Sequence, residues 1–406
     1  MKLKALIREE LPAACSFLLG LIRFPSLSGR ESEVMEYLAE GFGPFTEAVE
    51  KVPFPTDFPQ DPEYSFPVTG LSYAGRYNLR ITAGGSAGLP VLFNTHTDVV
   101  PASSGQKAAF EPRVDGTVVY GRGACDAKGQ IATLYLLLRV LRRLGGSLPP
   151  IVLHLVTEEE VGGNGTLAMV RRGEKAGAAV VLEPTGNRMV TSVRGALWFR
   201  LSCAGQAGHS GSAGGSVSAL KNCVEAMGLL ERYHARLLSQ SRGFPLFDRF
   251  ENPMPLTFGR LTAGNWPAAA PDHACLEGVL GFLPNKNRRE VMEELEAYLE
   301  ENGSAALRNS FLLEYTYRHD CHVLPPDHPL VLLLQRACVR SGQTEEVAAF
   351  PASCDSWYYH NLLGIPTLVY GPGHLRFAHS AEEQIDLEEV AAAAEVLARF
   401  ASSAEP

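Results

Sequence analysis

The sequence predicts an α/β protein in which a mixed central sheet flanked by helices is interrupted by a second, α+β domain. Up to residue 188, and again after residue 320, short apolar runs typical of strands alternate with helical patterns. Between residues 189 and 320 the order becomes β-α-β-β-α-β, which is that of a ferredoxin-like layer. With 406 residues the chain can bury two cores. We therefore expect a discontinuous first domain, residues 1–188 and 321–406, and an inserted second domain, residues 189–320.

The first domain is predicted to begin with an amphipathic helix, because Leu11, Cys15, Leu18 and Ile22 recur at helical spacing. A segment rich in Pro and aromatic residues, 52–77, predicts an ordered surface loop or hairpin. The remaining pattern predicts helices at 31–42, 131–144, 329–341 and from 387, and strands at 78–81, 90–94, 151–156, 179–182 and 367–370. Such alternation favours a parallel or mixed sheet with helices on both faces.

In the inserted domain the periodicity predicts four strands and two helices. The strands are expected at 190–203, 255–261, 273–283 and 311–317, and the helices at 217–238 and 288–302. This stretch lacks the acidic strand-end loops of the first domain. The chemistry is therefore expected in the first domain.

Composition excludes several classes of function. The formal net charge of −9 and the lack of a basic cluster interleaved with aromatic residues argue against nucleic-acid binding. No run of about 20 apolar residues is present, so we expect no membrane span. The eight cysteines are scattered without a Cys-x-x-Cys pair, which favours reduced thiols and a cytoplasmic protein.

The chemistry-bearing residues follow apolar strands in glycine-punctuated loops. The five segments are Asn94-Thr95-His96-Thr97-Asp98, Gly121-Arg122-Gly123-Ala124-Cys125-Asp126, Thr157-Glu158-Glu159-Glu160, Leu182-Glu183-Pro184 and Phe377-Ala378-His379-Ser380. In open α/β sheets, active sites lie beyond the carboxyl ends of the strands. Two histidines and three or more carboxylates there predict a two-metal hydrolytic site, with ions roughly 3.5–4 Å apart.

Four of the five segments also have a simpler interpretation. Asp126 is placed to cap the helix that follows it, and the triplet Glu158-Glu159-Glu160 resembles a solvated acidic turn. His96 and His379, taken singly, resemble ordinary core or surface histidines. Glu183 is the exception, since an unpaired carboxylate at the end of an apolar run is costly. The metal-site interpretation depends on all five segments meeting.

The order of these segments resembles that of the M20 metallopeptidase and deacylase family, which includes acetylornithine deacetylase and succinyl-diaminopimelate desuccinylase. The resemblance extends from Phe24-Pro25-Ser26 to Glu383 and implies a zinc-peptidase-like catalytic domain with an inserted lid and dimerisation domain. It also implies five metal ligands, a general base, a carboxylate that orients the first histidine, and a histidine that reaches the site across a dimer interface. In this chain those residues are His96, Asp126, Glu160, Glu183 and His379 as ligands, Glu159 as base, Asp98 as the orienting carboxylate and His209 as the histidine from the partner. The metals implied are zinc, with cobalt or manganese as alternatives.

The chain departs from the family pattern where substrate is held. Gly281 stands where family members commonly carry an arginine, Ala268 where an asparagine is common, and Trp357 where a second arginine often follows Asp355. The chain therefore lacks, at these three positions, the side chains that commonly bind a substrate carboxylate in the family. The residues we expect to contact substrate instead are Asn265, Trp357, Tyr358, His374 and Arg376.

The resulting hypothesis is a homodimeric, dinuclear amidohydrolase that removes the acyl group from an N-acyl amino acid or a related N-acyl amine. A dipeptidase or carboxypeptidase would use the same residues, and a non-catalytic binding homologue would be expected to have lost one of them. A two-metal phosphoesterase is disfavoured because only Arg122 and Lys128 lie beside the ligand segments. A serine hydrolase is disfavoured because the Gly-x-Ser-x-Gly motif is absent.

Overall fold

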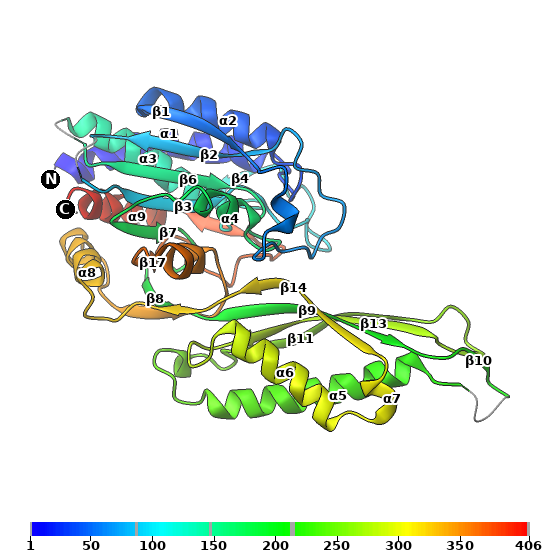
Figure 1. The fold of residues 1–406 in the computed structure, drawn as a ribbon. Coiled ribbons are helices and arrows are strands. Elements are labelled where there is room, and N and C mark those ends of the chain that lie inside the picture. Colours follow the sequence, from blue (N-terminus) through cyan, green and yellow to red (C-terminus); the bar gives the residue numbers. More distant parts are fainter. Residues whose placement is uncertain (1, 86–87, 146–147, 212–215, 404–406) are drawn as a thin grey trace.

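The computed structural model describes residues 2–85, 88–145, 148–211 and 216–403, and two separate sheets dominate it (Figure 1). The larger sheet has nine strands in the order β1-β2-β6-β3-β7-β17-β8-β15, with β16 also paired to β8. Its strands are β1 (Ala48–Pro53), β2 (Tyr77–Ala83), β3 (Val91–His96), β6 (Ile151–Val156), β7 (Ala178–Val181), β8 (Met189–Val193), β15 (His322–Val323), β16 (Val347–Phe350) and β17 (Thr367–Val369). Strands β6, β3, β7 and β17 are mutually parallel, whereas β1 and β2 pair in an antiparallel fashion. The predicted mixed α/β sheet is confirmed.

Helices cover both faces of this sheet because successive strand side chains point to opposite sides. Phe93 and Leu153 belong to a core shared with most of the helices, whereas Leu92 and Val152 belong to a second core on the other face, with α4. The helices are α1 (Lys2–Ile22), α2 (Ser32–Phe42), α3 (Lys128–Leu144), α4 (Asn164–Val170), α8 (Pro329–Ser341) and α9 (Leu387–Ala401). In α1 the buried stripe includes Leu18 and Ile22 as expected. None of the described helices is both long and apolar enough to cross a bilayer.

The segment inserted between β8 and β15 has its own sheet and its own core, and it forms the lower part of Figure 1. Its sheet has the order β11-β13-β9-β14, with every neighbouring pair antiparallel. The elements follow in the predicted β-α-β-β-α-β order, with one short helix added: β9 (Gly195–Ala204), α5 (Ala219–Gln240), β11 (Leu256–Ala263), β13 (His273–Phe282), α6 (Arg288–Asn302), α7 (Ala305–Arg308) and β14 (Phe311–His319). Helix α6 begins where expected because Asn287 and Glu290 form a capping box.

One predicted strand is divided. The single strand expected at 190–203 consists of β8 in the large sheet and β9 in the inserted sheet, with Arg194 between them. Apolar alternation continues through both strands, so periodicity could not reveal the change of sheet. Residues 189–193, which follow the predicted domain boundary at 188/189, therefore pair within the large sheet.

Short strands were also missed. A three-stranded sheet of β4 (Arg113–Asp115), β5 (Val118–Tyr120) and β18 (Gln384–Asp386) lies beside the large sheet, and β10 (Gly208–His209) pairs with β12 (Ala269–Ala270). The segment predicted at 52–77 as a loop or hairpin is mainly the long connection, residues 54–76, of the β1–β2 hairpin. Strands of two or three residues are too short to leave a periodic signal.

Candidate metal centre

Three parallel strands deliver the candidate ligands to one edge of the large sheet. Strand β3 ends at His96, the loop after β6 carries Glu159 and Glu160, and β7 is followed by Glu183. Because β3 lies between β6 and β7 and parallel to both, their carboxyl ends are neighbours. The tertiary structure thus brings together side chains that the sequence only places after strands.

Asp126 lies between the two histidines. Its Oδ1 is 2.9 Å from His96 Nε2, and its Oδ2 is 3.4 Å from His379 Nε2. His379 Nε2 is also 3.0 Å from Glu160. Asp126 does not act as a helix cap, because α3 begins at Lys128 without a side-chain capping bond. One carboxylate that presents an oxygen to each of two imidazoles is the arrangement that bridging two cations requires.

Asp98 fixes the loop that carries the neighbouring carboxylates. Its two carboxylate oxygens accept hydrogen bonds from the backbone N–H groups of Glu159, at 3.1 Å, and of Glu160, at 3.2 Å. Ser28 donates a further bond to the same carboxylate. The ring of His96 is closer to the backbone carbonyl of Asp98, at 3.0 Å, than to its carboxylate, at 3.5 Å. Asp98 therefore positions the acidic loop as well as the imidazole.

Glu158 is directed away from the centre. It is fully buried, pairs with Arg76 and accepts bonds from Tyr73 and Asn164. Its φ of 61° lies in the left-handed region, which a residue other than glycine adopts only when its surroundings hold it there. This turn separates the triplet, so that Glu158 is structural while Glu159 and Glu160 face the ligands.

Glu383 has a supporting role that the sequence did not predict. One oxygen accepts the backbone N–H groups of Cys125 and Asp126, each at 3.1 Å, and the other pairs with Arg122 at 2.5 Å. The carboxylate thus holds the backbone of Asp126, the central candidate ligand. Its position four residues after His379 was the available signal, because the stretch that resembles the family ends at Glu383.

The charges of the centre are strongly coupled. Burial would raise the pKa of Asp126, but hydrogen bonds from His379 and His96 lower it below its usual range. Burial would lower the pKa of His379, yet its bonds to Asp126 and Glu160 raise it to about 11. Burial raises the pKa of Glu159 and of Glu183 well above the usual range, and in each case neighbouring carboxylates add to the shift. A buried excess of carboxylates beside two imidazoles is a donor set that fits divalent cations.

Three of the five candidate ligands lie close together around one point. Atoms of His96, Asp126 and Glu160 lie within 4.8 Å of one another. His379 adjoins Asp126 and Glu160 at the distances given above. Glu183 is also buried. After burial itself, the charge of Asp126 contributes most to the raised pKa of Glu183.

Two expected substrate contacts are wrong in their placement. Trp357 and Tyr358 are 1% and 0% exposed and belong to the core behind the sheet. Trp357 stacks beneath the guanidinium of Arg288, and the Tyr358 hydroxyl donates to the Gly162 carbonyl. Their aromatic character therefore reflects packing, and neither ring is exposed to solvent.

His374 and Arg376 lie on the loop before His379. His374 borders a cavity of about 250 Å³ that is also lined by Pro184, Thr185 and Phe250, next to Glu183 and facing the inserted segment. Arg376 is exposed and its guanidinium covers the ring of Phe377. Of the expected substrate contacts in this loop, His374 is the one that borders a cavity beside the ligands.

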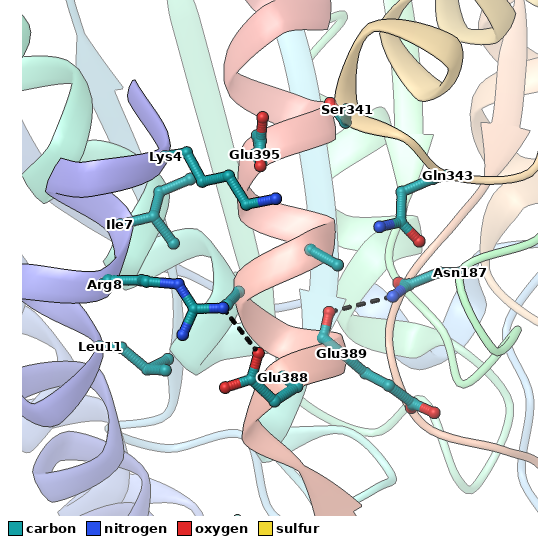
Figure 2. A pocket seen from close by; sticks show the side chains of 12 residues that line it. Lys4, Ile7, Arg8, Leu11, Asn187, Ser341, Gln343, Glu388, Glu389 and Glu395 are labelled. Carbon is teal, nitrogen blue, oxygen red and sulfur yellow. Dashed lines mark hydrogen bonds and ion pairs between the residues drawn. The ribbon is translucent and has the colours of Figure 1, made fainter. Parts of the chain in front are cut away.

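A second cavity, of about 310 Å³, lies apart from the ligands between α1 and α9 (Figure 2). Its lining includes Arg8, which pairs with Glu388, and Glu389. Glu389 also accepts the backbone N–H of Gly373 at 2.8 Å and pairs with His374 at 3.0 Å. None of the candidate ligands lines this cavity. Glu389 connects it to the loop that carries His374.

His209 and Asn265 are exposed near the tip of the inserted segment. His209 lies on β10, which Figure 1 shows at the far end of that segment from the large sheet. Its Nδ1 accepts a bond only from the nearby Gly211 backbone among the described residues. The structure therefore does not bring His209 or Asn265 to the metal centre of their own chain.

The chain is similar to known proteins over most of its length. Residues 92–403 match the model of Peptidase family M20/M25/M40. A relative from Bacillus subtilis (strain 168), N-formyl-4-amino-5-aminomethyl-2-methylpyrimidine deformylase, is 26% identical over 385 residues, with 84% of this chain and 83% of that protein covered. The dipeptidase Dug1p from Saccharomyces cerevisiae superposes with a TM-score of 0.78 at 14% identity, covering 100% of this chain and 99% of that one. The YXEP protein of Bacillus subtilis, a dinuclear metal-binding peptidase from the M20 family, gives 0.66 at 14% identity, covering 97% and 98%.

Fold and site together define a metal-dependent hydrolase of amide bonds. The chain belongs to the peptidase family M20/M25/M40. The resemblance noted in the sequence is confirmed.

Proposed function

We propose that this enzyme removes a small acyl group from an N-acyl amine, with Glu159 as the general base. The observation that carries the proposal is the position of Asp126, which presents one oxygen to His96 and the other to His379. Glu159 is buried beside this group on a loop that Asp98 holds. The relative that acts as a deformylase supports the choice of a small acyl group.

Glu159 would accept a proton from the attacking water and later deliver it to the leaving amine nitrogen. Burial raises the pKa of Glu159, and a carboxylate with a raised pKa holds a proton more readily than an exposed one, as a group that carries a proton from water to the amine must. Two divalent ions, when bound, polarise the amide carbonyl and lower the pKa of water to about 7. We propose His96, Asp126, Glu160, Glu183 and His379 as their ligands. Zinc suits this mixture of imidazole and carboxylate donors best, and cobalt or manganese would be accepted.

The amine side of the substrate is proposed to lack a tightly bound α-carboxylate. At Gly281, where the family commonly has an arginine, a Cβ would lie 2.7 Å from Pro255 Cδ and 3.0 Å from Arg194 Nη1. A larger side chain therefore has no room there. The cavity bordered by Thr185 and His374 is the proposed pocket for one end of the substrate.

We further propose that the segment predicted as the inserted domain, residues 189–320, forms a lid and dimerisation domain once β8 is assigned to the large sheet, and that residues 1–188 and 321–406 together with β8 form the catalytic domain. Val224 of α5 is 56% exposed and Leu312 of the edge strand β14 is 60% exposed, as a surface that pairs with another copy would be. A homodimer would allow His209 of one copy to reach the centre of the other and stabilise the carbonyl oxygen. Asn265 would accompany it, since both lie near the β10–β12 pair.

A cytoplasmic location is proposed from the thiols. All eight cysteines lie in the described ranges, and each is free. Reduced cysteines are usual in the cytoplasm.

The test is turnover of a substrate panel by metal-loaded enzyme. N-formyl, N-acetyl and N-succinyl amines, with and without an α-carboxylate, are compared with dipeptides by detection of the released amine. We expect the small acyl amines to be hydrolysed fastest. Faster cleavage of dipeptides would replace the proposal with a peptidase, and a strict need for the α-carboxylate would contradict the proposed pocket.

A further inference from the structure

A second cluster of metal-binding atoms lies directly behind Glu159. Atoms of Glu159, His319 and Asp355 lie within 4.8 Å of one another. The three residues come from different parts of the chain: the loop after β6, the last residue of β14 in the inserted segment, and the loop after β16. His319 and Asp355 are not among the ligands proposed above.

His319 is arranged as metal-bound histidines are. It is 0% exposed, and its Nδ1 lies 2.8 Å from the hydroxyl of Tyr317, which is in turn 2.9 Å from Ser353. Its Nε2 is buried and has no hydrogen-bond partner among the described residues. A ligating histidine typically bonds its second ring nitrogen to a neighbouring group, which fixes the ring and leaves the other nitrogen for the ion. Burial lowers the pKa of His319 to about 3, so the ring is in the neutral form that binds metal.

Asp355 shows the same division between its two oxygens. One oxygen accepts a bond from the Thr166 hydroxyl at 2.6 Å. The other is buried and, within the described part of the chain, has no partner. A buried carboxylate oxygen without a donor is costly, and a cation would remove that cost.

The two unpartnered atoms converge over Gly163. A Cβ at this position would lie 2.4 Å from the free oxygen of Asp355, 2.5 Å from Cε2 of Tyr358 and 2.9 Å from Nε2 of His319, so the Tyr358 ring borders the same space. Gly163 also has a φ of +70°. Any other residue would therefore both occupy this space and strain the turn.

Charge favours a cation at this point. Glu159 and Asp355 are both carboxylates, and within the described ranges neither forms an ion pair with an arginine or lysine. Burial raises the pKa of Asp355 to about 7 and that of Glu159 well above its usual value, so a cation would replace the protons that these groups otherwise hold. The donor set of one imidazole nitrogen and two carboxylate oxygens is one that zinc accepts.

We propose that Glu159, His319 and Asp355 form a third divalent-cation site, separate from the pair of ions at Asp126, which fills when metal is in excess. An ion there would engage the carboxylate of Glu159 and remove it from proton transfer, so excess metal would inhibit the enzyme. The inhibition rests on the proposed role of Glu159, whereas the binding does not.

The experiment counts the metal bound to the purified enzyme during dialysis against increasing zinc, for the unaltered chain, His319→Gln and Asp355→Asn. His273→Gln, which alters an exposed histidine of β13, is the matched control for surface binding. We expect the unaltered enzyme and the control to bind a third ion after the first two, and the other two variants to stop at two. Saturation of the unaltered enzyme at two ions overturns the site, and this result does not depend on any variant folding. A third ion that persists in His319→Gln also overturns it.

Activity measured in the same samples tests the inhibition. We expect turnover of the unaltered enzyme to fall as the third ion binds, and Asp355→Asn to lose this response. A third ion without loss of turnover refutes the inhibition but not the site. An enzyme that hydrolyses none of the panel refutes the proposed function, while the metal count still decides the site.

Discussion

The candidate metal centre and the tip of the inserted segment hold their functional residues in opposite ways. At the centre, Asp126 is 9% exposed and contacts two histidines, and a buried carboxylate holds its backbone. At the tip, His209 is exposed and has only its own loop as a partner among the described residues. One chain can therefore assemble the centre by itself, whereas a role for the tip requires another surface. Substitutions at the two places should behave accordingly.

The largest effect is expected at Glu159. Replacing it by Gln keeps the size of the side chain and the backbone bond to Asp98 but removes the proton acceptor. We expect kcat to fall by about 10²–10⁴-fold, the usual contribution of a general base. Steady-state kinetics and metal analysis without excess metal should show low turnover while the first two ions remain bound. A variant that retains most of its activity would assign the base elsewhere.

At the tip, His209→Ala should reduce kcat by about 10²–10³-fold, as loss of one oxyanion donor does. Because the side chain is exposed, the melting temperature should not change. Mixing this variant with Glu159→Gln sharpens the comparison, since a mixed dimer would contain one intact centre if His209 acts across the interface. Recovery of activity on mixing is the expected result, and its absence in demonstrated mixed dimers would exclude action in trans.

A smaller effect is expected at Glu383, which supports the centre without facing it. Glu383→Gln should weaken metal binding or activity by roughly 10–100-fold. The substitution removes the charge of Glu383, which weakens its ion pair with Arg122 and its hold on the backbone of Asp126. Glu382→Gln is the matched control, since the neighbouring side chain is exposed. Metal affinities from competition with a chelator should differ between the two variants. Equal affinities would show that Glu383 is not needed to position the ligand.

The smallest effect is a release of protons when metal binds. In the metal-free protein, carboxylates raise the pKa of His379 to about 11 and that of His96 well above its usual value. His379 therefore carries a proton at pH 7 and must lose it to bind an ion, and the raised pKa values of His96 and Glu183 favour further release. We expect at least one proton to be released, and affinity to fall as the pH decreases. Calorimetry in buffers of different ionisation enthalpy measures this number, and a value of zero would mean that the rings are already neutral.

Much of the site was predictable because strand ends are predictable. The apolar run before His96 and the one before Glu159 are both buried strands, and their parallel pairing makes neighbours of residues far apart in sequence. Trp357 and Tyr358 were misplaced because an aromatic residue gives the same signal in a pocket and in a core. Glu383 and His319 were missed because their importance comes from contacts across the fold.

The sequence by itself determined the mixed α/β class, the inserted β-α-β-β-α-β unit and the side chains able to bind metal, since these depend on local periodicity and residue chemistry. Only the tertiary structure decided that Glu158 turns away while Glu159 and Glu160 face the ligands, because Asp98 and Arg76 hold the two sides of that turn. It likewise decided that one strand divides at Arg194 between two sheets. Hydrogen bonds between distant segments fix these features, and no local pattern encodes them.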